Sequence, residues 1–262
     1  MKKALLVTLL TLLSAVCFAQ NVDPIRFLGI PVDGSEAQFI EELKAKGFTY
    51  NKDTHGYKGQ FNGQTVNVFV HTNHNVVDRI FVAFPFTTEE YIKNEFNTLL
   101  DQFNNNGKYV DLVLNDKIPT DEDISYQITV NNKRYEASFS YFSPKHDPVP
   151  MIDALLDKCA EFFTDEEMAK LKEYFRKVTE AQEDQKEALR DEMVAEMQKM
   201  GFGQPKTEAE YEKSVRFIST IIEGMRSMAD GEVWFIIHEY YGNYQIGLYY
   251  DNIQNQAHGE DL

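Results

Sequence analysis

The stretch EVWFIIHEYYGNYQIGLYYDN, residues 232–252, decides the fold, because it predicts an antiparallel hairpin that is rich in aromatic residues on both sides. The Gly242-Asn243 dipeptide predicts a two-residue type II′ turn, since Gly tolerates a positive φ at the first turn position. A two-residue turn fixes the register, and the register assigns alternate side chains to opposite faces. The composition of each face therefore follows from the sequence.

The two faces of this hairpin differ. One face is apolar and is predicted to be core; it carries Phe235, Ile237, Tyr241, Tyr244, Ile246, Leu248 and Tyr250. The other face mixes aromatic rings with hydrogen-bonding groups, and its candidate ligand-binding residues are Trp234, His238, Tyr240, Gln245, Tyr249 and Asp251. Gly247 is expected opposite His238, where it would leave a gap in that surface.

Two interpretations of the mixed face follow from its composition. In the first, the hairpin is central and another layer covers this face, which Tyr and Trp tolerate because their polar tips can reach partners at the rim. In the second, the face is an exposed groove for a glycan or a peptide. The Trp and Tyr side chains would then stack on the ligand, and the His, Gln and Asp side chains would supply polar contacts.

Outward from this hairpin, the chain predicts further antiparallel strands and amphipathic helices. Asn62-Gly63 and Asn131-Asn132 mark two more hairpin turns, and residues 76–84 form a strand that is apolar on both faces. Capping boxes, in which a hydroxyl and a Glu or Gln side chain satisfy exposed amides, predict helix starts at Ser35, Thr87, Thr164 and Thr207. The order of elements favours an α+β fold with antiparallel hairpins packed against helices.

The domain organisation is expected to be simple. A signal peptide over residues 1–19 precedes a single α+β domain over 20–262. A helix followed by a hairpin recurs along the chain, so the alternative is two degenerate helix–hairpin units at about 24–145 and 146–262.

One long acidic helix is predicted at about 165–200, where the chain has no Gly or Pro. At 1.5 Å per residue it would be about 55 Å long. Its middle offers no large apolar side chain to bury, so it would project into solvent, and a bend near 181–186 is the alternative. A projecting helix would expose Leu189, Met193 and Met197 for docking of a partner protein.

The N-terminus predicts export. Residues 1–19 have a basic start and an apolar run that ends at Val16, and we expect cleavage after Ala19. That run is shorter than the roughly 20 residues that a membrane span requires. Cys17 offers a lipoprotein as the alternative, although lipoprotein processing favours a smaller residue than Val16 before the cysteine. The expected location is periplasmic or secreted.

The composition excludes one class of partner. The chain has 42 acidic against 26 basic residues and a formal net charge of −16. A nucleic-acid-binding protein needs a basic surface for the phosphate backbone, so we expect no nucleic-acid partner. No apolar run after the signal is long enough for a membrane span.

Reactive groups are few. After signal cleavage Cys159 is the remaining cysteine, and its apolar neighbours at helical spacing indicate a buried, inert thiol. His71 and His74 form an H-x-x-H pair on a strand, where residues three apart lie on opposite faces, so no metal site is expected. The acidic segment 120–126 lacks the ligand spacing of a calcium loop and is interpreted as a solvated start of a strand. No catalytic or cofactor-binding motif is present, and no cofactor is expected.

The ends of the chain carry a resemblance. The C-terminal YGNYQIGLYYDNIQNQAHGEDL, the early FLGIPVDGSEAQFIEELKAKGF and the signal ending CFAQ resemble exported, functionally uncharacterised proteins of Bacteroidetes. This resemblance covers the two ends and implies an exported location, but it implies no activity and no site residues.

These observations predict an exported, non-catalytic binding or interaction protein whose ligand is a protein, a peptide or a glycan. The alternative is a hydrolase whose site is assembled from residues far apart in the sequence. That alternative predicts a concave pocket that contains a His or a carboxylate with a perturbed pKa.

Overall fold

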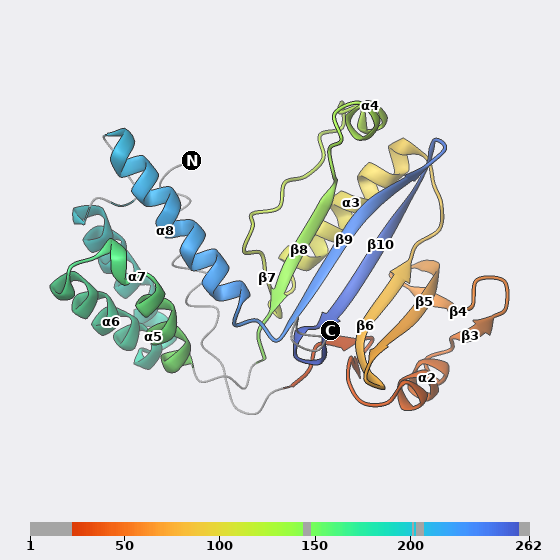
Figure 1. Cartoon of the computed structure of the whole chain (residues 1–262), viewed down its shortest axis with the longest axis horizontal. Helices are drawn as coiled ribbons and strands as arrows, with labels where there is room; N and C mark the ends of the chain where they lie inside the picture. The colour runs from red at the N-terminus through yellow and green to blue at the C-terminus, as the bar shows by residue number, and fades with distance from the viewer. Residues whose placement is uncertain (1–22, 144–147, 201, 203–206, 257–262) are drawn as a thin grey trace. The chain divides into compact units, whose positions relative to one another are not determined.

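The computed structural model describes residues 23–143, 148–200, 202 and 207–256 (Figure 1). They belong to two compact units, one formed by residues 142–228 and the other by residues 23–141 together with the chain from Ala229 onward. The expected signal peptide at 1–19, with Cys17, lies outside the described residues.

The second unit is built on an eight-stranded antiparallel sheet with the strand order β3-β4-β5-β6-β10-β9-β8-β7. The strands are β3 (Thr49–Asn51), β4 (Gly56–Phe61), β5 (Gln64–Asn73), β6 (Val76–Ala83), β7 (Tyr109–Val110), β8 (Glu136–Tyr141), β9 (Gly231–Tyr240) and β10 (Asn243–Asn252). A separate ribbon pairs β1 (Arg26–Phe27) with β2 (Ile30–Pro31). The predicted α+β class is confirmed, and the C-terminal hairpin β9–β10 lies at the centre of the sheet.

Helices cover one face of this sheet. In Figure 1, α3 (Glu89–Asn104) lies along β8, β9 and β10, and the ring of Phe96 contacts Phe235 with centroids 4.9 Å apart. Helix α2 (Glu36–Ala45) buries Phe39 and Leu43 in the same core. The predicted core face of the last hairpin is confirmed at Phe235, Ile237, Tyr244, Ile246, Leu248 and Tyr250, all of which are buried. Tyr241 is the exception, because it lies in the turn and is fully exposed.

The turn of this hairpin differs from the prediction by one residue. The turn residues are Tyr241 and Gly242, with φ angles of 51° and 78°, so the turn is of type I′ rather than II′. Moving the turn by one residue moves every cross-strand partner by two residues, and the alternation of faces survives. The face assignment is therefore confirmed, but the predicted pairing of Gly247 with His238 is wrong, since Gly247 lies opposite Ile236.

The first predicted hairpin forms with Asn62-Gly63 as its two-residue turn. The predicted helix caps are confirmed at Ser35, Thr164 and Thr207, whose side chains accept hydrogen bonds from the first turns of α2, α6 and α8. The predicted cap at Thr87 is wrong, because α3 begins one residue later, after Thr88. The backbone of Thr87 instead pairs with Tyr244 of β10.

The predicted middle hairpin does not form. Only its second strand, β8, exists, and the first half is the helix α4 (Ile124–Thr129). The carboxylate of Asp123 accepts a hydrogen bond from the amide of Tyr126, and the carboxylate of Glu89 accepts one from the amide of Ile124. These two bonds satisfy amides at the helix start, which overrides the alternating pattern of a short segment. The acidic segment 120–126 therefore leads into a helix and not into a strand.

The first unit is helical over its described residues. It contains α5 (Pro148–Lys158), the 3₁₀ helix η1 (Ala160–Phe162), α6 (Asp165–Glu180), α7 (Glu183–Lys199) and α8 (Glu208–Arg226). The single helix predicted at 165–200 is wrong, because the backbone is extended at Ala181 and Gln182. This bend matches the alternative near 181–186. Helix α6 buries Leu171, Phe175 and Val178, and α7 buries Met193 and Met197. Of the three residues expected to be exposed for docking, Met193 and Met197 are buried and Leu189 is partly exposed, so the predicted exposed stripe does not exist.

Cys159 lies in the core of this unit with no exposed surface. Burial raises the pKa of its thiol to about 11. The interpretation as a buried thiol is confirmed, and such a group is a poor nucleophile near neutral pH because little of it is thiolate. In the part of the chain that the structure describes, no helix is long and apolar enough to cross a membrane.

Candidate ligand-binding site

Four aromatic rings stand in one row on the sheet face opposite α3. The row runs from Phe69 on β5 through Phe81 on β6 and Tyr249 on β10 to Trp234 on β9, and each ring lies directly opposite the next in the strand register. The successive centroid distances are 5.4, 4.7 and 3.9 Å, with interplanar angles of 20°, 16° and 6°. We call these four residues the aromatic row. With strands about 4.8 Å apart, the row crosses about 14 Å of the sheet.

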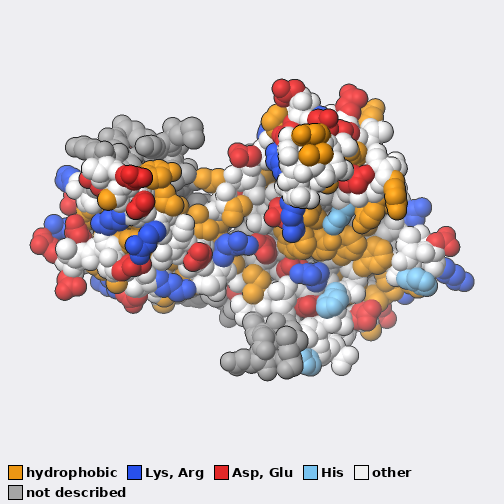
Figure 2. Space-filling model, turned by 45° about the horizontal axis from the view of Figure 1, so that its top comes forward, with side chains coloured by type: hydrophobic (Ala, Val, Ile, Leu, Met, Phe, Trp, Pro, Cys, Tyr) orange, Lys and Arg blue, Asp and Glu red, His pale blue; other side chains and the backbone are white. Residues whose placement is uncertain are grey.

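None of the four rings is fully buried. All four side chains have intermediate exposure, although the strands that carry them are central in the sheet. Figure 2 shows hydrophobic side chains gathered in one area of the unit that contains the sheet, with Lys or Arg and His side chains at its border. Because directly opposite aromatic pairs stabilise a sheet, the stacking within the row helps to hold its rings in place.

The Trp234 end of the row is fixed by polar contacts. The indole N–H donates a 2.9 Å hydrogen bond to Asp251 Oδ2. The Asp251 carboxylate also accepts from Nε and Nη2 of Arg79, at 2.6 and 2.8 Å, and these hydrogen bonds raise the pKa of Arg79. The guanidinium lies 5.9 Å from the Trp234 ring centroid and 5.8 Å from that of Tyr249. The indole therefore has one defined orientation before any ligand binds.

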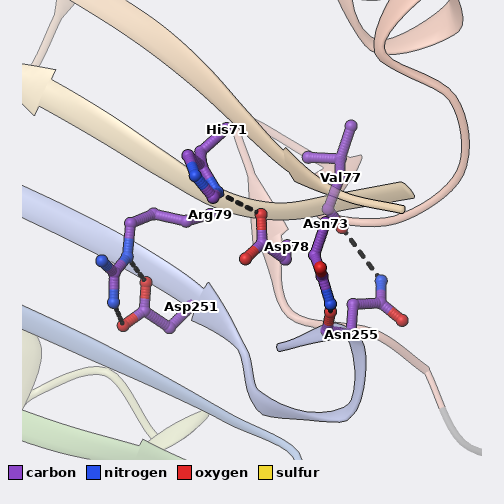
Figure 3. A network of polar contacts seen from close by, with 7 residues as sticks. All are labelled: His71, Asn73, Val77, Asp78, Arg79, Asp251 and Asn255. Carbon is purple, nitrogen blue, oxygen red and sulfur yellow. Dashed lines mark hydrogen bonds and ion pairs between the residues drawn. The ribbon is translucent and has the colours of Figure 1, made fainter. Parts of the chain in front are cut away.

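A β-bulge places a second carboxylate near this ion pair (Figure 3). His71 on β5 pairs with Arg79 on β6, and the next residue, Thr72, pairs with Val77. Asp78, which lies between Val77 and Arg79, therefore has no partner on β5. Bulges re-aim side chains in this way. The Asp78 carboxylate meets His71 Nδ1 at 2.7 Å, and the two side chains are 8% and 68% exposed. The nearly buried carboxylate of Asp78 thus orients the imidazole of His71 through Nδ1, and Nε2 does not take part in this contact.

The 3₁₀ helix η2 (Ile253–Asn255) holds the bulge from the other side. The Asn255 side chain donates to the carbonyl of Val77, and the Asn73 side chain donates to the carbonyl of Asn255, each at 2.9 Å. These bonds connect η2 to both strands of the β5–β6 hairpin, next to Asp78.

The gap expected over Gly247 is filled, so that expectation is wrong. A Cβ at Gly247 would lie 3.0 Å from Phe81 Cε2, 3.1 Å from His238 Nε2 and 3.2 Å from Tyr249 Cε2. Any side chain at 247 would therefore require the rings around it to shift slightly. Burial lowers the pKa of His238, and the positive charge of Arg134 lowers it further, which favours the neutral imidazole.

The far end of the predicted face is separate from the aromatic row. Tyr240 is 49% exposed and packs edge-to-face on Phe86, which is 57% exposed, with centroids 5.6 Å apart. The Gln245 side chain donates to the carbonyl of Phe84 at 2.7 Å, so it fixes the chain after β6. Its amide N–H₂ therefore already has a protein partner.

The six candidate residues named from the sequence lie on one face, but they are not one cluster. The structure brings Trp234, Tyr249 and Asp251 into direct contact and places His238 beside Tyr249 over the glycine. The predicted stacking of Trp234 and Tyr249 on a ligand is limited by geometry, because these two rings stack on each other.

Sequence reasoning missed five residues of this surface: Phe69, Phe81, Arg79, His71 and Asp78 as a group. One feature of the sequence could have indicated them. Residues 76–84 are apolar on both faces of the strand, so apolar side chains such as Phe81 must also lie on the face away from the helices. The strand neighbours that complete the row come from non-local pairing, which the hairpin turns do not determine.

A surface pocket of about 400 Å³ lies beside α2 and is distinct from this face. Its lining residues are Pro24, Arg26, Ile30, Pro31, Asp33, Gly34, Gln38, Phe39, Glu41 and Glu42. The lining contains the carboxylates of Asp33, Glu41 and Glu42 but no His, and the Arg26 guanidinium is bound to Asp23 at 2.8 Å.

Among the described residues, no group of three or more His, Cys, Asp and Glu side chains is arranged to hold a metal ion. Comparisons of the chain with protein-family models, with curated proteins and with solved structures gave no match. The functional argument therefore depends on the geometry of the sheet face.

Proposed function

We propose that this chain is an exported binding protein and that the aromatic row forms its ligand surface. The observation that carries the proposal is the row itself, four half-buried rings in register on the sheet face away from α3. Large aromatic side chains supply much of the binding energy at protein surfaces. Because the rings already hold one another in place, a ligand would order few side chains on binding. The signal sequence at residues 1–19 supports a periplasmic or secreted location.

The polar groups at the Trp234 end support binding rather than simple packing. Asp251 is 5% exposed and is used twice, by the indole N–H and by Arg79. Binding surfaces combine an apolar area with a few placed polar groups that fix orientation. This end of the row has both.

The proposal is tested with arrays of glycans and peptides probed with the full chain. Phe81→Thr removes a central ring and keeps a residue suited to a strand. Tyr91→Thr is the matched control, since Tyr91 is a 67% exposed aromatic residue on α3, outside the row. We expect Phe81→Thr to lose captured ligands at least about tenfold and Tyr91→Thr to retain them. A Phe81→Thr protein that is folded by circular dichroism and binds like the wild type would contradict the proposal.

A second candidate, a hydrolase, is supported by the contact between His71 and Asp78 alone. A carboxylate that orients an exposed imidazole is the arrangement of a general base, which contributes about 10²–10⁴-fold to rate. Hydrolysis of chromogenic esters, phosphate esters and glycosides is compared between the wild type and His71→Gln. A loss of at least about a hundredfold in the variant supports this candidate, and equal rates in the two proteins eliminate it.

A further inference from the structure

The stacking within the aromatic row leaves one ring face for a ligand. Neighbouring centroids are 3.9 to 5.4 Å apart. A ligand ring inserted between two of them would need roughly twice the 3.5–4.0 Å contact distance of carbon atoms. The inner rings therefore present only their edges to solvent. Stacking on a ring face is confined to the two ends of the row.

The two ends differ in what lies next to them. At the β5 end, the ring of Phe69 leans over Gly56, where a Cβ would be 2.8 Å from its Cε1 atom. That ring thus packs against the β4 backbone. At the β9 end, the next residue in the row is Ser138 on β8, directly opposite Trp234. A serine side chain is too short to cover an indole, so the outer face of Trp234 has no ring or long side chain beside it in the row.

The chemistry around that indole face is polar, and two of its carboxylates are paired. The Asp251 carboxylate is paired with Arg79, and Glu136, two residues before Ser138 on β8, is paired with Arg134 at 2.7 Å. The Trp234 N–H is already used by Asp251. What remains for a ligand is a π face, with its negative quadrupole, beside the Ser138 hydroxyl.

We infer that the outer face of Trp234 stacks on a neutral sugar ring, with the Ser138 hydroxyl bonded to one of its hydroxyl groups. This inference rests on the proposed function and names its ligand class. The C–H groups on one side of a sugar ring carry partial positive charge and match the negative face of an indole. A cationic ligand would also match a π face, but the paired carboxylates offer it no uncompensated negative charge. An apolar side chain would leave the serine hydroxyl without a partner.

The substitution Ser138→Leu tests this inference directly. A leucine at 138 fills the space beside the indole, while the backbone bonds of Ser138 to Asn115 do not depend on the side chain. The stacking of Trp234 on Tyr249 is preserved. Thr98→Leu is the matched control, because it places a leucine at an exposed residue of α3, outside the row.

The probes are the neutral oligosaccharides cellohexaose, xylohexaose, mannohexaose and chitohexaose, with a trilysine peptide as the cationic comparison. Binding to the full chain is followed by calorimetry and by emission of Trp234, which is the single Trp in the sequence. We expect at least one oligosaccharide to shift this emission, Ser138→Leu to weaken its binding at least tenfold, and Thr98→Leu to change it less than about twofold. Trp234→Leu, measured by calorimetry, provides an independent loss variant if Ser138→Leu does not fold.

Three outcomes overturn the inference: no oligosaccharide binds, only trilysine binds, or the oligosaccharide binds Ser138→Leu or Trp234→Leu as tightly as the wild type. These outcomes are distinguishable from failure of the proposed function. A peptide that loses binding in Phe81→Thr but not in Ser138→Leu would retain the aromatic row as the ligand surface and eliminate the sugar.

Discussion

The indole of Trp234 and the phenol of Tyr249 stack with centroids 3.9 Å apart and planes 6° apart. Since the two residues are direct cross-strand partners on β9 and β10, this contact joins the two strands of the C-terminal hairpin on the side away from α3. It also sets the orientation of the ring at the end of the aromatic row. The stack of Trp234 on Tyr249 therefore serves both the stability of the hairpin and the proposed binding of a ligand by Trp234.

The first prediction concerns this stack. Trp234→Ala and Tyr249→Ala are each expected to destabilise the protein, with a coupling free energy of about 0.5–1.5 kcal/mol in a double-mutant cycle. The exposed, edge-to-face pair of Phe86 and Tyr240 is the control, and we expect a smaller coupling there. Urea unfolding of the variants measures both values. If the double variant loses as much unfolding free energy as the two single variants lose together, the two rings do not stabilise each other.

The second prediction compares the two partners of the ion pair. Asp251 is 5% exposed and Arg79 is 39% exposed, so only the arginine can regain water when its partner is removed. Arg79→Met should therefore cost more, about 2–4 kcal/mol, than Asp251→Asn, about 1–2 kcal/mol, because it leaves a buried carboxylate unpaired. Chemical unfolding at neutral pH measures the difference. The reverse order would mean that Asp251 is better solvated than its burial indicates.

How far the sequence predicts this fold is visible in the last hairpin. The alternation of apolar and mixed positions assigned Phe235 and Tyr250 to the core and Trp234 and Tyr249 to the other face, although the turn was misplaced. Because side chains alternate between faces every two residues, an error of two residues in the cross-strand pairing leaves every side chain on its predicted face. In the segment 124–130 the same alternation failed, because the cap at Asp123 stabilises a short helix that no strand pattern reports.

The third prediction uses the turn that was misplaced. Tyr241 has a φ of 51° at a position of the type I′ turn where Asn is preferred, and its side chain is fully exposed. Tyr241→Asn is expected to stabilise the protein by about 0.5–1 kcal/mol, because Asn adopts the left-handed region at lower cost. Thermal unfolding measures the gain. A loss of stability on this substitution would argue that the tyrosine ring makes contacts that offset its backbone strain.

The fourth prediction concerns pH. Burial lowers the pKa of His238 in the folded protein, so the unfolded chain takes up a proton at a higher pH than the folded one does. The stability that neutral His238 contributes is complete above the unfolded pKa of about 6.5 and is lost as pH falls from there through the folded pKa. His238→Gln should therefore lose less stability between about pH 7.5 and pH 5 than the wild type.

Urea midpoints across this pH range check the fourth prediction, and an NMR titration of the His238 ring gives the folded pKa. A ring titration midpoint at or above 6.5 would contradict it. Gln keeps a hydrogen-bonding group of similar length at this position, so the comparison isolates the titration.

The candidate site was predicted in part, for a physical reason. The residues named from the hairpin, such as Trp234 and Asp251, belong to strands that are adjacent in sequence. The neighbours that complete the surface, Phe81 and Arg79, come from β6, which pairs with β10 across more than half of the chain. The contact of Asp78 with His71 depends on a bulge, which changes the register at one residue and leaves no periodic signal.

Accessibility of Trp234 to acrylamide is the most direct test, because the aromatic row can bind a ligand only if solvent reaches it. The chain has one Trp, so the quenching of its emission reports on this residue alone. We predict quenching between that of a free indole and that of a buried one, and a clear decrease in Ser138→Leu, where the outer ring face is covered. Emission that acrylamide does not quench in the folded wild type would show that another part of the protein covers the row.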